Sequence, residues 1–124
     1  MIKIINQDIT AGFQWSTSEQ VWPFEKDSTG RILYCKELNL GEPPNNGQVS
    51  KAHNISSLDT RKVLSWYGIL KSNTNSAVYD LNGAWDVGAG YRMVCNVGTT
   101  TCTMNTDSGT YLGHTAYIRI IYSK

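Results

Sequence analysis

The sequence has no long apolar run and no concentration of charge. No apolar stretch approaches the roughly 20 residues needed to cross a bilayer, so we expect no membrane insertion. The 11 basic and 10 acidic residues are scattered, giving a net charge of +1, and no basic cluster exists that could bind a run of phosphates, which argues against nucleic acid as a partner. The apolar residues 1–5 are followed at once by Asn6, Gln7 and Asp8, too early for a signal peptide. This predicts synthesis and folding in the cytoplasm.

Cysteine and histidine are also scarce. Three cysteines and two histidines form no C-x-x-C pair and no zinc-finger spacing, so we expect neither a metal site nor a cofactor. Cys95 and Cys102 could face each other across a hairpin turning near Gly98 and Thr99, either as a disulfide or as two reduced thiols. The thiols are favoured because the protein is expected to fold in the cytoplasm. Cys35 lies in an apolar strand pattern and is expected in the core.

Helical periodicity, internal repeats and Gly-rich phosphate loops are absent, while turn residues are abundant. Charged residues make up 17% of the chain, below the roughly 25% of typical soluble domains, and 11 glycines accompany many Ser, Thr and Asn. Candidate strands recur about every ten residues with turn signals between them, the pattern of a sandwich or barrel. The sequence therefore predicts an all-β protein, an antiparallel β-sandwich.

Two strands carry most of the expected core. Residues 31–40 place Ile32, Tyr34, Leu38 and Leu40 on one face, which only Lys36 interrupts. Residues 62–70 are apolar on both faces, with Leu64, Trp66 and Leu70 on one and Val63, Tyr67 and Ile69 on the other. A strand of that kind belongs in the middle of a sandwich or against a partner subunit.

Further strands are expected on either side of these. Residues 20–25 should pair back across the turn at 27–30, with Pro23 restricting them to an edge or a bulge. Other short strands are expected at 48–53, 77–81, 91–96 and 101–106. The last strand, 115–123, puts Ala116, Ile118, Ile120 and Tyr122 on one face. We expect an N-terminal strand or connector at 1–15 and a sandwich domain at 16–124.

Three segments, in order, resemble the C-terminal head module of phage and prophage tail fibres and receptor-binding proteins. The first is STSEQVW at 16–22 followed by GRILYCK at 30–36, similar to the family's dGkpIYrKt strand. The second, VSKAHNISSLD at 49–59, is similar to vaHgIsNid, with Asn54 in place of the usual Gly. The third, AYIRIIYSK at 116–124, is similar to the closing aYvtieYtK. Residues 73–109 have no counterpart in these motifs.

The resemblance implies a β-sandwich head, for which a jelly-roll-like topology is one expected form. Such heads are commonly homotrimers at the tip of a fibre or baseplate appendage. The expected location is the virion, after synthesis in the host bacterial cytoplasm. The expected partners are a host cell-surface glycan and other tail or baseplate proteins. A structural trimerisation or tip module without a ligand is the alternative function.

Aromatic residues with a polar group suggest where a saccharide would bind. Four Trp and seven Tyr accompany only two Phe, and such rings suit surfaces that are half apolar and half wet. They lie beside acids and amides in residues 79–92 and in the loop 106–114. The polar composition of that loop predicts that it is exposed, Tyr111 included. The candidate ligand-binding residues are Tyr79, Asp80, Asn82, Trp85, Asp86, Tyr91, Arg92, Asp107, Tyr111 and His114.

Several of these residues also fit other roles. Tyr79 and Trp85 could instead be core or subunit-contact residues, and His53 is expected to be a hydrogen-bonded structural residue. Asp80 and Asp86 could form the carboxyl pair of a glycosidase, which requires a separation of roughly 5–10 Å. A chain of 124 residues leaves little room for a catalytic cleft. We therefore expect a binding protein and not an enzyme.

Overall fold

The protein is a two-layer, all-antiparallel β structure in a computed structural model that describes residues 13–81, 93–107 and 109–124. The strands within these residues are β1 (Gln20–Lys26), β2 (Ile32–Gly41), β3 (Gly47–Ala52), β4 (Val63–Ser72), β5 (Val78–Asp80), β6 (Met93–Val97), β7 (Thr101–Thr106) and β8 (His114–Ser123), and a 3₁₀ turn, η1 (Thr60–Lys62), precedes β4. The all-β prediction is confirmed. The described part of the chain contains no helix long and apolar enough to span a membrane.

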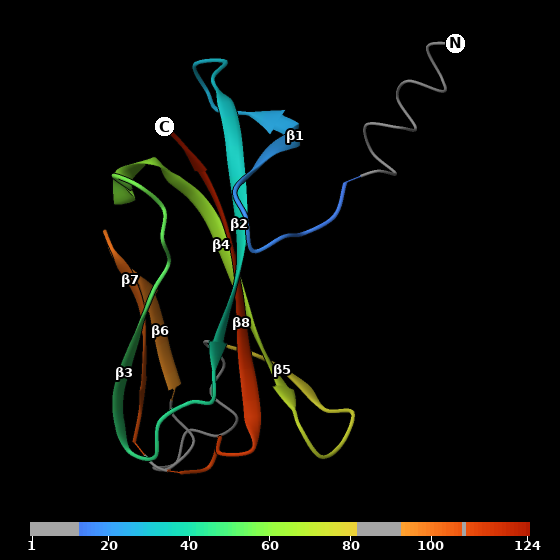
Figure 1. The fold of residues 1–124 in the computed structure, drawn as a ribbon. Coiled ribbons are helices and arrows are strands. Elements are labelled where there is room, and N and C mark those ends of the chain that lie inside the picture. Colours follow the sequence, from blue (N-terminus) through green and yellow to red (C-terminus); the bar gives the residue numbers. More distant parts are fainter. Residues whose placement is uncertain (1–12, 82–92, 108) are drawn as a thin grey trace.

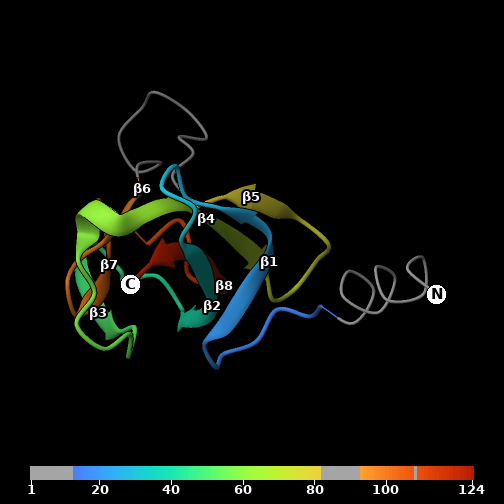
Figure 2. The same cartoon turned by 90° about the horizontal axis from the view of Figure 1, so that it is seen from above.

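The strands form a five-stranded sheet, β1-β2-β8-β4-β5, and a three-stranded sheet, β3-β7-β6. Figure 1 shows the smaller sheet lying against the middle strands of the larger one, with β1 and β5 at the two outer edges, and Figure 2 shows the same two layers from above. Strands β2 and β3 follow each other but lie in different sheets, where they pair with β8 and β7 respectively. This nested pairing is jelly-roll-like, although the strands divide five and three.

The core lies between the two sheets. The larger sheet contributes the alternating residues of β8 that the sequence predicted (Ala116, Ile118, Ile120 and Tyr122), all at most 1% exposed. The smaller sheet contributes Met93, Cys95, Cys102 and Met104. Because successive side chains of a strand point to opposite faces, the same alternation leaves Tyr117, Arg119 and Ile121 on the outer face of the larger sheet.

Strand β1 is an edge strand, as Pro23 predicted. It pairs back onto β2 across the turn, and its register is irregular between Trp22 and Lys26. The turn between them is held by Asp27, whose carboxylate accepts hydrogen bonds from the backbone N–H groups of Thr29 and Arg31.

Two expected core positions prove wrong. Ile32 is 52% exposed, because it lies at the end of β2 opposite Lys26 of the edge strand. Leu64 is 47% exposed, because the pairing with β8 shifts between Val63 and Ser65. This bulge turns Leu64 out of the alternation, so Val63 packs on the core together with Trp66.

Lys36 does face the core, as its position predicted. Its side chain is buried, and its ammonium group donates a hydrogen bond to the carbonyl oxygen of Asn54 (3.1 Å). The same loop explains how Asn54 can stand where similar sequences have Gly. Asn54 has a φ of 55°, in the left-handed region that Gly and Asn tolerate best.

Candidate functional site

The structure describes five of the ten predicted ligand-binding residues. Asn82, Trp85, Asp86, Tyr91 and Arg92 lie outside the described residues, and their predicted role stays a prediction. The described residues are Tyr79 and Asp80 on β5, Asp107 just after β7, Tyr111 in the following loop, and His114 at the start of β8.

Three of these residues meet at one end of the sandwich. The His114 ring centroid lies 5.8 Å from that of Tyr79 and 6.2 Å from that of Tyr111. The Nδ1 atom of His114 is 3.2 Å from the carbonyl oxygen of Tyr111 and 3.1 Å from that of Leu112. Only a nitrogen bearing hydrogen can bond to carbonyl oxygens, so Nδ1 is the protonated atom and the ring is fixed by its own loop.

These five residues do not form one surface. Tyr111 is 3% exposed and belongs to the core, so the expectation that it is an exposed loop residue is wrong. Tyr79 also packs against the core, whereas its neighbour Asp80 is exposed, as alternation along β5 requires. Asp107 is exposed on the loop after β7. Ligand binding at Tyr79, Asp80, Asp107 and His114 stays a prediction.

The outer face of the larger sheet carries a different set of polar and aromatic side chains, arranged in two rows. In the first row Glu37 on β2 lies opposite Arg119 on β8, and Arg119 lies opposite Tyr67 on β4. In the second row Asn39, Tyr117 and Ile69 are paired in the same way, and Ile69 is paired in turn with Asp80. Directly opposed residues have Cβ atoms about 4.5–5.5 Å apart, so each row is a continuous line of contacts.

Arg119 is held at the centre of this face. Its Nε lies 3.6 Å from Oε2 of Glu37, and its guanidinium carbon lies 4.8 Å from the ring centroid of Trp15. Tyr67, on its other side, is 56% exposed. Lys71, two residues beyond Ile69 on β4, places its ammonium group 5.3 Å from the ring centroid of Tyr117 in the second row. The face therefore combines an open ring with fixed hydrogen-bonding groups.

The sequence predicts that Tyr67 shares one face of residues 62–70 with Ile69 but not which face is outward, and it does not join Tyr67 and Arg119 into a site. The outward parity of Tyr117 and Arg119 is visible in the sequence. The register that brings residues 37, 67 and 119 into one row is not, because it depends on which distant strands pair.

An aromatic cluster extends this face across β1. The Trp15 and Trp22 rings stack with centroids 5.4 Å apart and planes 28° apart. Phe13 meets Trp22 edge to face at 5.3 Å, and Phe24 meets it at 4.7 Å. The Trp22 Nε1 donates to Glu25 at 3.4 Å. Since Arg119 also contacts Trp15, the aromatic surface runs from Tyr67 to Phe24.

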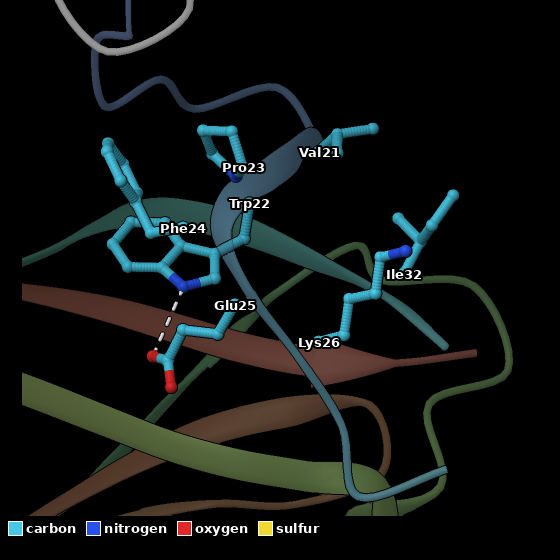
Figure 3. A pocket seen from close by; sticks show the side chains of 7 residues that line it. All are labelled: Val21, Trp22, Pro23, Phe24, Glu25, Lys26 and Ile32. Carbon is cyan, nitrogen blue, oxygen red and sulfur yellow. Dashed lines mark hydrogen bonds between the residues drawn. The ribbon is translucent and has the colours of Figure 1, made fainter. Parts of the chain in front are cut away.

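A shallow hollow of about 310 Å³ lies beside this cluster, lined by Val21, Trp22, Pro23, Phe24, Glu25, Lys26 and Ile32. Figure 3 shows Trp22, Phe24 and Glu25 on one side of the β1 backbone, and Val21 and Ile32 on the other. Both Val21 and Ile32 are about half exposed. The hollow therefore follows the edge of the sheet and does not enter the core.

The segment before β1 is fastened to the sheet at two points. The Glu37 N–H donates to the carbonyl oxygen of Ser16 (2.8 Å). Further along, Glu19 forms an ion pair with Lys124 (2.5 Å) and accepts a hydrogen bond from the Tyr122 hydroxyl. Partial burial acts to raise the pKa of Glu19, but these contacts outweigh it and the pKa lies below its ordinary value of 4.5. Burial, with the Glu19 contact, raises the pKa of Tyr122.

All three cysteines are buried, and none of them forms a disulfide. The hairpin between β6 and β7 turns where predicted, but Cys95 pairs with Met104 and Cys102 with Val97. The two cysteines are thus diagonal neighbours, a position about 7–8 Å apart that is beyond ordinary disulfide geometry. Burial raises the pKa of Cys95 to about 11 and that of Cys102 to about 12. The prediction of reduced thiols is confirmed.

His53 is a structural residue, as expected. It is 1% exposed; its Nδ1 accepts a hydrogen bond from the Ile55 N–H (3.0 Å), and its Nε2 donates to the Gly98 carbonyl oxygen (2.9 Å). Within the described residues no group of three or more His, Cys, Asp or Glu side chains is placed to hold a metal ion.

The fold and surface thus define a small β-sandwich with an open, aromatic outer face. No protein-family model matches the chain, and no curated protein matches it. Among solved structures it is similar to an N-truncated R2-type pyocin tail fibre, with 14% identity and a TM-score of 0.36, covering 94% of this chain and 41% of that one. It is also similar to an N-truncated R1-type pyocin tail fibre, with 14% identity and a TM-score of 0.37, covering 94% of this chain and 93% of that one.

Proposed function

We propose that this chain is a non-catalytic head domain of a phage tail fibre or receptor-binding protein, and that it recognises a saccharide on the host cell surface. The observation that carries the proposal is the outer face of the larger sheet, where the exposed ring of Tyr67 lies beside the Glu37–Arg119 pair. A sugar ring has an apolar C–H face that stacks on an aromatic ring, and hydroxyl groups that bond to carboxylate and guanidinium. The tail-fibre context comes from the resemblance of residues 16–124 to the head module.

Recognition on such a face would be shallow and reversible. An open sheet surface buries less of a ligand than a cleft does, so each site would bind weakly. In a homotrimer carried by other tail or baseplate proteins of the virion, several weak sites would act together and raise the overall affinity.

The test is binding of the fluorescently labelled domain to a glycan array and to whole bacterial cells. Binding that soluble polysaccharide from the same cells abolishes would support the proposal. A correctly folded protein that binds neither the array nor any cell panel would exclude it. Release of reducing ends from a bound polysaccharide would show that the protein is an enzyme.

A structural role without a ligand is the second candidate. It is favoured by the exposure of Tyr67 and Val78, two large side chains on the outer face. If this face joins copies of the chain, analytical ultracentrifugation will find an assembly that Tyr67→Asp disperses. A monomer of 13.8 kDa would argue against it.

A further inference from the structure

The two rows on the outer face differ in what they offer a ligand. The first row runs from a carboxylate through a guanidinium to an exposed ring, as Glu37, Arg119 and Tyr67. Neighbouring strands lie about 4.8 Å apart, so this row spans about 10 Å across three strands. It is long enough to contact more than one group of an oligosaccharide. The second row supplies the Asn39 amide group, whose Oδ1 is already bonded to the Gly41 N–H (2.8 Å), so that its nitrogen can donate.

The guanidinium group of Arg119 is held in a fixed orientation that suits hydrogen bonds to hydroxyl groups. It meets Glu37 through Nε and is covered by the ring of Trp15. Among the described residues its two terminal nitrogens have no hydrogen-bond partner, so their donors can serve a ligand. Glu37 supplies acceptor oxygens next to them. A hydroxyl group can both donate and accept a hydrogen bond. Two neighbouring hydroxyl groups of a sugar can therefore bind here together, one accepting from Arg119 and the other donating to Glu37.

The charges on this face are balanced. The outward side chains of β2, β8, β4 and β5 include two bases, Arg119 and Lys71, and two acids, Glu37 and Asp80. Arg119 is neutralised by Glu37. The exposed Lys71 lies over the Tyr117 ring, and Asp80 lies on β5, the strand that pairs with the Lys71 strand β4. A face of this kind has no net positive field to attract a sulfated or sialylated polymer.

We infer that the ligand of this face is a neutral pyranose with adjacent free hydroxyl groups, stacked on Tyr67 and held by the Glu37–Arg119 pair. This inference rests on the proposed function, and it adds the site and the ligand class. Tyr67 is the stacking platform, Glu37 and Arg119 fix the hydroxyl groups, and Trp15 positions Arg119. Of the residues predicted from sequence, Tyr79, Tyr111 and His114 meet at one end of the sandwich, whereas Asp80 lies on this outer face, in the second row.

The experiment measures dissociation constants on immobilised neutral oligosaccharides (hexose and N-acetylhexosamine) and on sialylated and sulfated ones. Removing the ring in Tyr67→Ala should weaken binding about tenfold, while Tyr67→Phe keeps the ring and should stay within about twofold. Arg119→Lys should also lose about tenfold, because a lysine lacks the planar set of donors. Val94→Ala, an exposed position on β6 in the other sheet, is the matched control and should bind as the original does.

Each of the other outcomes overturns a different part of the inference: the site, the ligand class or the underlying function. If the protein binds neutral glycans but the Tyr67 and Arg119 variants bind equally well, the site is elsewhere and the proposed function stands. If it binds only sialylated or sulfated glycans, with affinity falling steeply as salt is raised, the ligand class is wrong. If the folded protein binds no glycan at all, the proposed function fails and this inference fails with it. Circular dichroism and thermal melting of each variant separate loss of binding from loss of fold.

Discussion

Gly68 on β4 lies against the buried side chain of Leu81, the residue after β5, and its replacement gives a sharp test of the packing. A Cβ built on Gly68 would lie 2.3 Å from Cδ2 and 2.7 Å from Cβ of Leu81, whose side chain is fully buried. Normal carbon contacts are about 3.5–4.0 Å, so Leu81 would have to move by about 1 Å in a filled core. We expect Gly68→Ala to destabilise the protein although alanine suits a strand better than glycine.

The magnitude follows from two opposing terms. Overpacking of a core costs about 1–3 kcal/mol, and alanine gains about 0.5–1 kcal/mol over glycine in a strand interior. The expected net loss is about 1–2 kcal/mol of unfolding free energy. Leu81→Ala alone should cost about 2–5 kcal/mol through the cavity it leaves. In the double variant the new Cβ partly fills that cavity, so the combined loss should be smaller than the sum by about 1 kcal/mol.

The assay is urea denaturation followed by tryptophan fluorescence. It compares the unfolding free energies of the four proteins of this double-mutant cycle (the original, the two single variants and the double variant), provided that their m-values agree. Gly109→Ala is the control: its added Cβ would meet Asn45 Oδ1 at 2.6 Å, but that side chain is exposed and can rotate away, so the loss should stay below about 0.5 kcal/mol. A loss below about 0.5 kcal/mol for Gly68→Ala, or strict additivity in the cycle, would refute this account of the packing.

Three further predictions concern buried or paired polar groups. His53→Ala leaves the buried Ile55 N–H and the half-buried Gly98 carbonyl oxygen without their partner, so urea denaturation should show a loss of about 2–4 kcal/mol in unfolding free energy. A loss below about 1 kcal/mol would contradict the structural role of His53. Cys95 and Cys102 should not react with Ellman's reagent at pH 8 until the protein is unfolded, since their raised pKa values keep them as thiols; rapid labelling of the native protein would be inconsistent with their burial. Folding lowers the pKa of Glu19, so its carboxylate stabilises the protein above pH 4.5, and this effect is lost as the pH falls further. The melting temperature of the original protein should therefore drop more below pH 4.5 than that of Glu19→Gln. Equal drops in the two proteins would show that the Glu19–Lys124 contact is not formed.

The elements of the fold were largely predictable because each depends on local alternation and turns. The buried face of β8 followed from its period of two, and β7 was found with its bounds unchanged. Prediction failed where local pattern gives no signal. A bulge reverses the parity of a strand, and nothing in residues 62–70 shows that Val63 and not Leu64 faces the core. Tyr111 was expected at the surface because its neighbours are polar, yet the chain turns inward there.

The same limit explains why the sequence did not point to the row of Glu37, Arg119 and Tyr67 on the outer face as a candidate site. A search for ligand-binding residues by composition finds groups that are close in sequence, such as Tyr79 and Asp80, but neighbours on a strand point to opposite faces. Tyr79 accordingly packs on the core while Asp80 lies on the outer face. A site on the face of a sheet is instead assembled from every second residue of strands that pair across the chain. Glu37, Tyr67 and Arg119 meet only because β8 lies between β2 and β4, and this register has to be known before the row can be seen.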